Sequence, residues 1–440
     1  MNVVRRLRDL SVQKRETAIV GNLVARIGAL VSLTIASFVV ARLGGPPAVG
    51  ILVLFRVLPW LLGVLLSGGL FGAAPYFLAR PASDARLPLT LFTIAAVSGA
   101  VGAAMWITAS PLLRETFFPN ISLGVVALAG ITVLTQNLES TAKACSQGTT
   151  DFVGSNRIIV LEELLFIPAY LLLLAVGVQE TVAIVPAMAI GDLCTAGQGW
   201  GRLARRGFFR NAGRPSFAIA RRVYSYGVRA QVGSVILLVN ARLDFAIVGA
   251  LVGPAALGVY AVASRYAELL RLPGLAVNYV LYPTYAGVDG KVAARDARRM
   301  LITLAWIPAA AALPLAAAAP IVLPLVFGEA FRSAVVPAWI LLFGLSAVGV
   351  SGIVSAFLFG DGRPGLNSLG LTSGLVVTVI LDVLLIPRFG VVGAAVASCA
   401  AYLTTSLVLL LCFVKVARSY ERSASSTPVP AMEPLTEVNQ

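Results

Sequence analysis

The sequence predicts an all-α polytopic membrane protein with twelve transmembrane helices, in two six-helix lobes related by a pseudo-twofold axis. Of the 440 residues, 58% are hydrophobic and 12% are charged, whereas soluble domains contain about 25% charged residues. The mean hydropathy is +0.89. Apolar runs long enough to span a bilayer recur along the chain, and one Gly-Pro motif recurs in its two halves. These observations exclude a soluble enzyme.

Twelve apolar segments have the length of about 20 residues that a bilayer requires. We expect these spans at 17–41, 49–79, 87–110, 122–146, 153–177, 181–201, 224–251, 256–283, 301–326, 335–359, 366–386 and 390–414. The first follows a basic cytoplasmic segment, 1–16, and is too long for the apolar core of a signal peptide, so we expect it to remain uncleaved. Residues 415–440 are polar and are expected to form a disordered cytoplasmic tail.

The positions of the basic residues test this count of spans. Of the 34 Lys and Arg residues, 24 fall in segments on the side of the N-terminus, 4 on the opposite side and 6 within spans. This bias predicts that both termini are cytoplasmic. The net charge of +14 then reflects topology and contact with anionic lipids, so we expect no nucleic-acid partner. The chain has no histidine and no CxxC pair, so we predict neither a metal site nor a disulfide.

The two halves carry related motifs. The first lobe, 17–201, and the second, 224–414, flank a basic cytoplasmic linker at 202–223. Gly45-Pro46-Pro47-Ala48-Val49-Gly50 recurs 208 residues later as Gly253-Pro254-Ala255-Ala256-Leu257-Gly258, Arg56 precedes Arg265 by 209 residues, and Asp151–Asn156 resembles Asp361–Asn367. Because six spans is an even number, both repeats would cross the membrane in the same orientation. Transporters of this architecture bind substrate between the halves.

Ionisable residues lie far from the ends of several spans. Each costs about 2.5–3.5 kcal/mol on insertion scales and is retained only where it faces protein or water. In the eighth span, Arg265, Glu268, Arg271 and Asn278 fall on one helical face. We therefore predict a central cavity that binds substrate through Arg26, Arg56, Arg242, Arg265, Arg271 and Asn278.

Two acids in these spans are candidates for coupling transport to a proton or sodium gradient, namely Asp244 and Glu268. The alternative is that they only position the neighbouring arginines, with Glu268 and Arg271 neutralising each other inside the bundle. Other acids at depth are Glu139, Glu162, Glu163, Asp192 and Asp382.

The excess of arginine favours an anionic substrate. Guanidinium is always charged and binds phosphate oxygens in bidentate fashion, so the cavity suits a phosphate or pyrophosphate. A cation exporter would need acids without excess arginine. A membrane-bound glycosyltransferase would need a large outward loop with catalytic acids, whereas Glu115 and Glu329 are isolated on short loops. We therefore expect a transporter and not an enzyme, and the deep arginines argue against a scaffold.

Three stretches resemble a known family. The stretches are RLGGPPAVGILVLFRVLPWLLGVLLSGGLFGAAPYFLAR, the related GALVGPAALGVYAVASRYAELL in the second half, and PRFGVVGAAVASCAAYL before the last span. All three are similar to regions of Wzx-type flippases. These belong to the multidrug/oligosaccharidyl-lipid/polysaccharide (MOP) exporter superfamily. The resemblance covers nearly the whole chain, but its motifs are diffuse and do not define the substrate.

The resemblance implies a MOP/MATE-like fold and a flippase of the bacterial cytoplasmic membrane. Such a flippase translocates an undecaprenyl-pyrophosphate-linked oligosaccharide by alternating access, for polysaccharide or lipopolysaccharide synthesis. Membrane lipids and the polysaccharide polymerase machinery are the implied partners, and no cofactor is implied. In the similar lipid II flippases, which have two further spans, essential arginines correspond by position to Arg26, Arg56 and either Arg265 or Arg271. A MATE-like cation or drug antiporter is the alternative.

Overall fold

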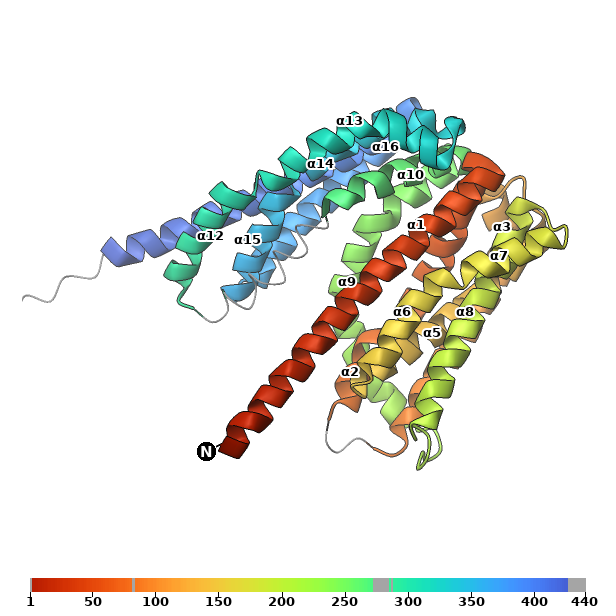
Figure 1. Cartoon of the computed structure of the whole chain (residues 1–440), viewed down its shortest axis with the longest axis horizontal. Helices are drawn as coiled ribbons and strands as arrows, with labels where there is room; N and C mark the ends of the chain where they lie inside the picture. Colours follow the sequence, from red (N-terminus) through yellow and green to blue (C-terminus); the bar gives the residue numbers. More distant parts are fainter. Residues whose placement is uncertain (1, 81–83, 272–284, 286–287, 426–440) are drawn as a thin grey trace, which may run out of the picture. The chain divides into compact units, whose positions relative to one another are not determined.

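The regular structure of the chain is helical. The computed structural model describes residues 2–80, 84–271, 285 and 288–425, and all regular elements in these ranges are helices (Figure 1). Eight segments among the described residues are long and apolar enough to cross a membrane. Some of them hold more than one predicted span, as Pro364–Tyr420 does. The described helices are consistent with the twelve predicted spans, of which the eighth lies partly outside the described residues, and the predicted fold class is confirmed.

Two very long helices are each divided by a glycine. α1 (Asn2–Leu66) is interrupted at Gly45, with φ of 66°, and α16 (Pro364–Ser425) at Gly390, with φ of 55°. Positive φ is accessible to glycine at little cost because it has no Cβ. Gly45 lies between the first two predicted spans, and Gly390 begins the predicted twelfth span. Each long helix therefore contains a change of direction between two spans.

The described chain divides into two compact units, each held together by its own contacts. The first comprises Met1–Ala263, Pro320–Pro337 and Leu381–Ala394, and the second comprises Ser264–Ala319, Ala338–Ile380 and Ala395–Gln440. The sequence-based division into two lobes around a linker at 202–223 stays a prediction.

In the first unit, α5 is the central helix. After α1 come α2 (Leu70–Leu78), α3 (Leu87–Phe117), α4 (Leu123–Leu128), α5 (Gly130–Gly148), α6 (Phe152–Leu164), α7 (Phe166–Ala175), α8 (Glu180–Arg205), α9 (Phe217–Leu251) and α10 (Pro254–Glu268). α5 packs against α1, α2, α3, α6 and α8. Many of its buried side chains are polar, among them Thr132, Asn137 and Glu139. Because buried polar groups need partners, the middle of this bundle is a candidate site.

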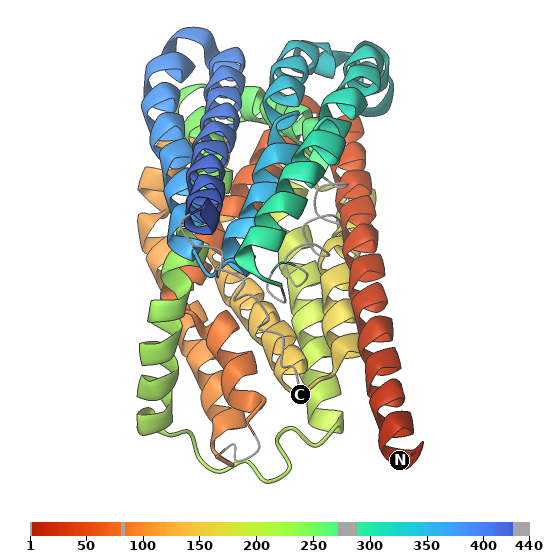
Figure 2. The same cartoon turned by 90° about the vertical axis from the view of Figure 1, so that its left-hand side faces the viewer.

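The second unit is built on the later helices. They are η1 (Leu269–Arg271), α12 (Gly290–Leu304), α13 (Ile307–Phe327), α14 (Val335–Leu345), α15 (Val348–Gly360) and the two ends of α16; η2 (Glu329–Ala334) and the end of α13 belong to the first unit. Figure 2 shows α12 (teal) beside α15 (light blue). Ala297, Phe357 and Phe413 join α12, α15 and α16 in one apolar core.

The two copies of the Gly-Pro motif meet within the first unit. A Cβ added to Gly50 would lie 1.7 Å from the carbonyl oxygen of Pro254, and one added to Gly258 would lie 2.0 Å from that of Pro46. The contact is reciprocal, as in an interface between two copies related by a twofold axis. This reciprocity agrees with the internal duplication predicted from the sequence.

Candidate functional site

Arg56 is held inside the first unit by an acid from a neighbouring helix. Its Nη1 lies 2.7 Å from Oε2 of Glu163, and the two side chains are 21% and 15% exposed. α1 and α6, which carry them, pack along each other. An ion pair this far from water is costly unless its geometry is good. The pair links Arg56 on α1 to Glu163 on α6.

Glu162, which precedes Glu163 in the sequence, pairs with a different cation. Glu162 Oε2 lies 3.0 Å from Nζ of Lys143 on α5. Consecutive residues of a helix point about 100° apart, so α6 directs Glu162 towards α5 and Glu163 towards α1. The two adjacent acids thus join three helices.

Two further acids complete a first-unit charge cluster, which we define as Arg56, Lys143, Glu139, Glu162, Glu163 and Asp192. Glu139 is 1% exposed and interacts electrostatically with Glu162 and Asp192. Thr135 Oγ1 lies 3.4 Å from Oδ2 of Asp192, which is 6% exposed. The cluster has four acids and two cations. Such a site can take up a proton or a small cation.

Arg26 lies in the part of α1 that precedes Gly45, and its side chain is exposed. Its Nε donates to Oδ1 of Asn22 over 2.9 Å, and Asn22 Nδ2 donates to Oδ1 of Asn156 over 3.0 Å. The two residues one helical turn apart thus connect α1 to the start of α6. Arg26, predicted to bind substrate, thus takes part in a polar contact between α1 and α6.

Asp244 is buried and accepts two hydrogen bonds. Tyr260 Oη donates to Oδ2 over 2.6 Å, and the backbone N–H of Phe245 donates to Oδ1 over 2.9 Å. The guanidinium carbon of Arg242 lies 5.2 Å from the centre of the Phe245 ring. The pair Arg242 and Asp244 is thus surrounded by aromatic rings of α9 and α10.

Asp382, on α16, is brought close to Asp244. It is fully buried, at 0% exposure, and lies near enough to Asp244 for the two charges to interact. Among the described residues, neither carboxylate oxygen of Asp382 has a hydrogen-bond partner. The sequence shows Asp382 as one of several acids at depth, but nothing in it links this residue to Asp244, 138 residues earlier. Two buried acids whose charges interact disfavour each other's ionised form, which favours uptake of a proton or a cation.

The predicted residues of the eighth span fall in the second unit. Arg265 and Glu268 on α10 and Arg271 on η1 are half-buried. The guanidinium carbon of Arg271 lies 5.2 Å from the ring centre of Tyr402 on α16. Asn278 lies outside the described residues. That all six predicted residues line one cavity stays a prediction.

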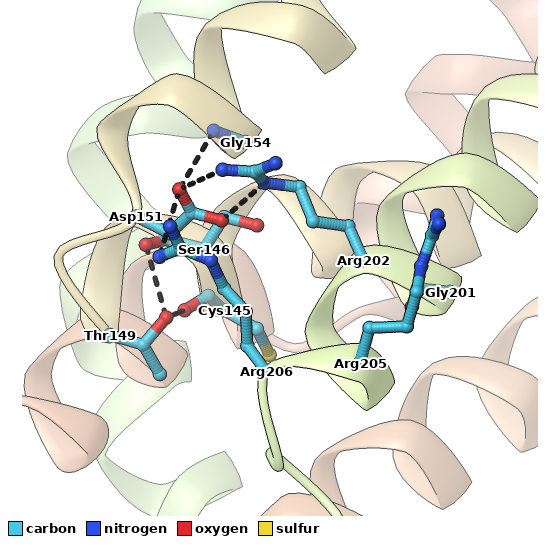
Figure 3. A network of polar contacts seen from close by, with 9 residues as sticks. All are labelled: Cys145, Ser146, Thr149, Asp151, Gly154, Gly201, Arg202, Arg205 and Arg206. Atoms are coloured by element: carbon cyan, nitrogen blue, oxygen red, sulfur yellow. Dashed lines mark hydrogen bonds and ion pairs between the residues drawn. The ribbon is translucent and has the colours of Figure 1, made fainter.

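A separate polar network ties the α5–α6 turn to the end of α8 (Figure 3). Asp151 caps α6 by accepting from the N–H of Gly154 over 3.0 Å, and Arg202 donates Nε to its Oδ2 over 2.7 Å. Arg206 Nη1 lies 3.2 Å from Oδ1. The hydrogen bond from Arg202 holds the pKa of the Asp151 carboxyl below its usual range. This contact fixes one end of the first unit.

The second unit contains a related contact. Asp361 follows α15 and accepts from Tyr420 Oη, at the far end of α16, while Arg363 Nε lies 2.9 Å from its Oδ2. The turn before the fifth span of each half is thus bound to the end of that half's last helix. The shared contact gives a physical reason for the resemblance in sequence between Asp151–Asn156 and Asp361–Asn367.

Comparison with known proteins places the chain among membrane transporters. A family model described as "Polysaccharide biosynthesis protein" matches residues 39–336, about two thirds of the chain. The chain therefore belongs to the polysaccharide biosynthesis protein family.

Relatives and solved structures agree with this family. The chain is 21% identical over 391 residues to "Probable low-salt glycan biosynthesis flippase Agl15" of Haloferax volcanii, covering 87% of this chain and 80% of the relative. An inward-facing MATE family transporter of the MOP superfamily has a TM-score of 0.71 at 13% identity, over 92% and 99% of the two chains. The lipid II flippase MurJ has a TM-score of 0.70 at 12% identity, over 94% of each chain. The family match confirms the predicted resemblance at the level of the family, and the solved transporter structures show that the chain has the predicted MATE-like fold.

Proposed function

We propose that the protein translocates an undecaprenyl-pyrophosphate-linked oligosaccharide across the cytoplasmic membrane, with both termini cytoplasmic. Polysaccharide biosynthesis flippases are lipid-linked sugar transporters, and the finer substrate assignment rests on charge. Transport proceeds by alternating access through an arginine-lined cavity, with no covalent step and no bound cofactor. Membrane lipids and a polysaccharide polymerase are its partners.

The observation that carries this proposal is the placement of Arg56. Its guanidinium is always charged, lies among the helices of the first unit and forms a 2.7 Å ion pair with Glu163. Arg242, Arg265 and Arg271 are likewise half-buried within helices. Guanidinium groups placed in this way bind a pyrophosphate without a large cost of ordering.

A cation gradient supplies the driving force through Asp244. The buried Asp382 beside it makes a second carboxylate available, so that a proton or Na⁺ bound between them would remove an unfavourable pairing of charges. Glu268, the other predicted coupling residue, lies at the end of α10 beside η1.

The test is a strain in which the gene is deleted, with lipid-linked oligosaccharide and surface glycan measured together. We expect the intermediate to accumulate on the cytoplasmic leaflet and the surface glycan to be lost. Arg265→Ala and Arg271→Ala, expressed at normal levels, should fail to restore the glycan. Normal glycan in the deletion strain would contradict the proposal.

A second candidate is cation or drug antiport. The observation that favours it is the acid excess of the first-unit charge cluster, in which Glu139 and Asp192 are buried with Glu162 and Glu163. A deletion strain with normal glycan and greater sensitivity to cationic compounds would support this function. Glu139→Gln and Asp192→Asn would then be the variants to test.

A further inference from the structure

A hollow of about 970 Å³ opens on the first unit, between the end of α2 and the start of α9. Its lining includes Phe77 and Tyr226 and three arginines, Arg221, Arg222 and Arg229. A second hollow of about 590 Å³ lies against the same part of α9 and shares Arg221 and Arg229. We name the two together the α2–α9 hollow. Arg221 and Arg229 therefore line both parts of the hollow.

The arginines of the hollow are arranged in register along one helix. Phe217, Arg221, Ser225 and Arg229 follow one another at intervals of four residues, which places neighbours on the same side of α9. Arg229 Nη2 donates to Ser225 Oγ over 2.8 Å, which directs this guanidinium along the helix towards Arg221. The positive-inside bias accounts for the presence of these cations, but it requires neither their alignment nor a hollow beside them.

A stack of side chains adjoins the hollow through Tyr226, which lines it. Tyr76 and Tyr226 stack with ring centres 4.1 Å apart, and the guanidinium carbon of Arg80 lies 4.3 Å from the centre of the Tyr76 ring. Arg80 also donates to Tyr76 Oη. This stack holds a fourth cation beside the three lining arginines.

The charge around the hollow is not balanced by the described acids. The acid nearest in the chain to the α2 stack, Asp84, makes a bidentate pair with Arg86, at 3.1 Å and 2.9 Å, and interacts electrostatically with Arg222 as well. One carboxylate shared with Arg86 does not offset the three lining arginines. Among the described residues, Arg221 and Arg222 form no ion pair. Cations clustered at an open site attract an anion, and arginine binds phosphate oxygens in particular. A ligand with at least two negative charges matches this cluster better than a single phosphodiester does.

The ligand must also reach the site from the membrane. Phe217 at the rim is 85% exposed, and Val228, which lines the smaller hollow, is also exposed. An apolar rim beside a cationic hollow matches a lipid whose polar head carries the charge. The charge bias of the loops assigns this end of α9 to the cytoplasmic side, where a lipid-linked intermediate would be presented.

We propose that the α2–α9 hollow is a docking site for the diphosphate head of a polyprenyl diphosphate lipid, at which the substrate binds before transport. This inference rests on the proposed function and adds a second binding position for the same substrate class. Arg221 and Arg222 contact the phosphates, Arg229 and Arg80 reinforce the positive field, and Phe217 lies against the polyprenyl chain.

The test counts lipids bound to the purified protein. Native mass spectrometry of the protein with undecaprenyl diphosphate should show two lipids per chain. Arg221→Gln with Arg222→Gln should weaken one of the two binding events by about tenfold or more, because charge-assisted hydrogen bonds are lost. The matched control is Arg210→Gln with Arg214→Gln, which removes the same charge from exposed positions of the same basic segment outside the hollow. The control should retain both lipids.

Other results would overturn the inference. Two lipids with unchanged affinity in the Arg221 and Arg222 variant would exclude the hollow while leaving the proposed function intact. Phosphatidylglycerol that displaces the second diphosphate lipid at equal concentration would show a general site for anionic lipids instead. No diphosphate lipid bound to the wild type would contradict the proposed function itself, together with the docking site.

Discussion

Gly258 faces the carbonyl oxygen of Pro46 so closely that a Cβ on Gly258 would lie 2.0 Å from it. Gly50 has the same relationship to Pro254, at 1.7 Å. Real Cβ atoms essentially never approach other atoms closer than 3.0 Å, and both obstacles are backbone, which cannot rotate away. The absence of a side chain at both glycines is therefore a steric requirement for α1 and α10 to meet.

Replacing Gly258 by alanine should destabilise the first unit. The backbone must shift to admit the methyl group, and overpacking of this kind costs about 3 kcal/mol or more. A thermal melt of the purified protein should show the loss. Gly197→Ala on α8 is the control, because a Cβ there meets nothing within 4 Å and alanine is the better helix former. Equal melting temperatures for the two variants would contradict the assigned role of Gly258.

The ion pair between Arg56 and Glu163 should contribute to both stability and transport. Glu163→Gln leaves Arg56 without its nearest counter-charge, and we expect a loss of about 3 kcal/mol and a clear fall in transport. Thermal melts and surface glycan in the complemented deletion strain would measure the two effects. Glu329→Gln is the control, because its partner Arg332 is exposed and surface pairs contribute only about 0–1 kcal/mol. A Glu163→Gln variant as stable and active as wild type would refute this prediction.

The Asp151 network should make stability depend on pH. The folded protein lowers the pKa of Asp151 through Arg202, so its stabilisation is fully present above the pKa of the unfolded chain, about 3.9. That stabilisation is lost as pH falls through the lower, folded pKa. Asp151→Asn should therefore cost about 2 kcal/mol near neutral pH, and the difference from wild type should shrink towards pH 3. Melting curves across this range measure it; a constant difference would contradict the assignment.

Asp382→Asn should abolish the coupling of transport to the cation gradient without lowering the stability of the protein. The carboxylate is fully buried, without a hydrogen-bond partner among the described residues, so a neutral amide of similar shape should leave the melting temperature equal or higher. Transport should lose its dependence on the cation gradient. Flipping of a labelled lipid in proteoliposomes, with and without a gradient, provides the measurement. Unchanged gradient dependence would exclude Asp382 from coupling.

Tyr260→Phe tests the role of Asp244, whose charge interacts with that of Asp382. The 2.6 Å hydrogen bond to Asp244 Oδ2 stabilises that carboxylate, and its loss should cost about 1–3 kcal/mol. The cation concentration that gives half-maximal transport should also change, since Asp244 would retain one fewer donor. A variant that is less stable but has the same cation dependence would assign Asp244 a structural role alone.

The sequence predicted the helices better than their partners. Apolar length gives the spans, and glycine with proline gives the breaks at Gly45 and Gly390, because both signals are local. The different partners of Glu162 and Glu163 depend on how α5, α1 and α6 pack. This packing cannot be predicted from the sequence of any one of these helices. The pairing of Asp244 with Asp382 likewise requires contact between residues far apart in the chain. The five predicted arginines lie in helices, and their role as substrate ligands stays a prediction. The deep acids were also visible in the sequence, but which cation each of them contacts was not.

The contacts of Asp151 and Asp361 have a consequence for biosynthesis. Each is completed by the last helix of its own half, through Arg202 on α8 and Tyr420 on α16. The contact between Asp151 and Arg202 can form as soon as α8 has been inserted, while the remaining helices are still being translated. The second must wait until α16 has been made almost to its end. The nascent chain thus acquires its two closing contacts at separate times, and the earlier one can hold the first six spans together while the translocon inserts the rest.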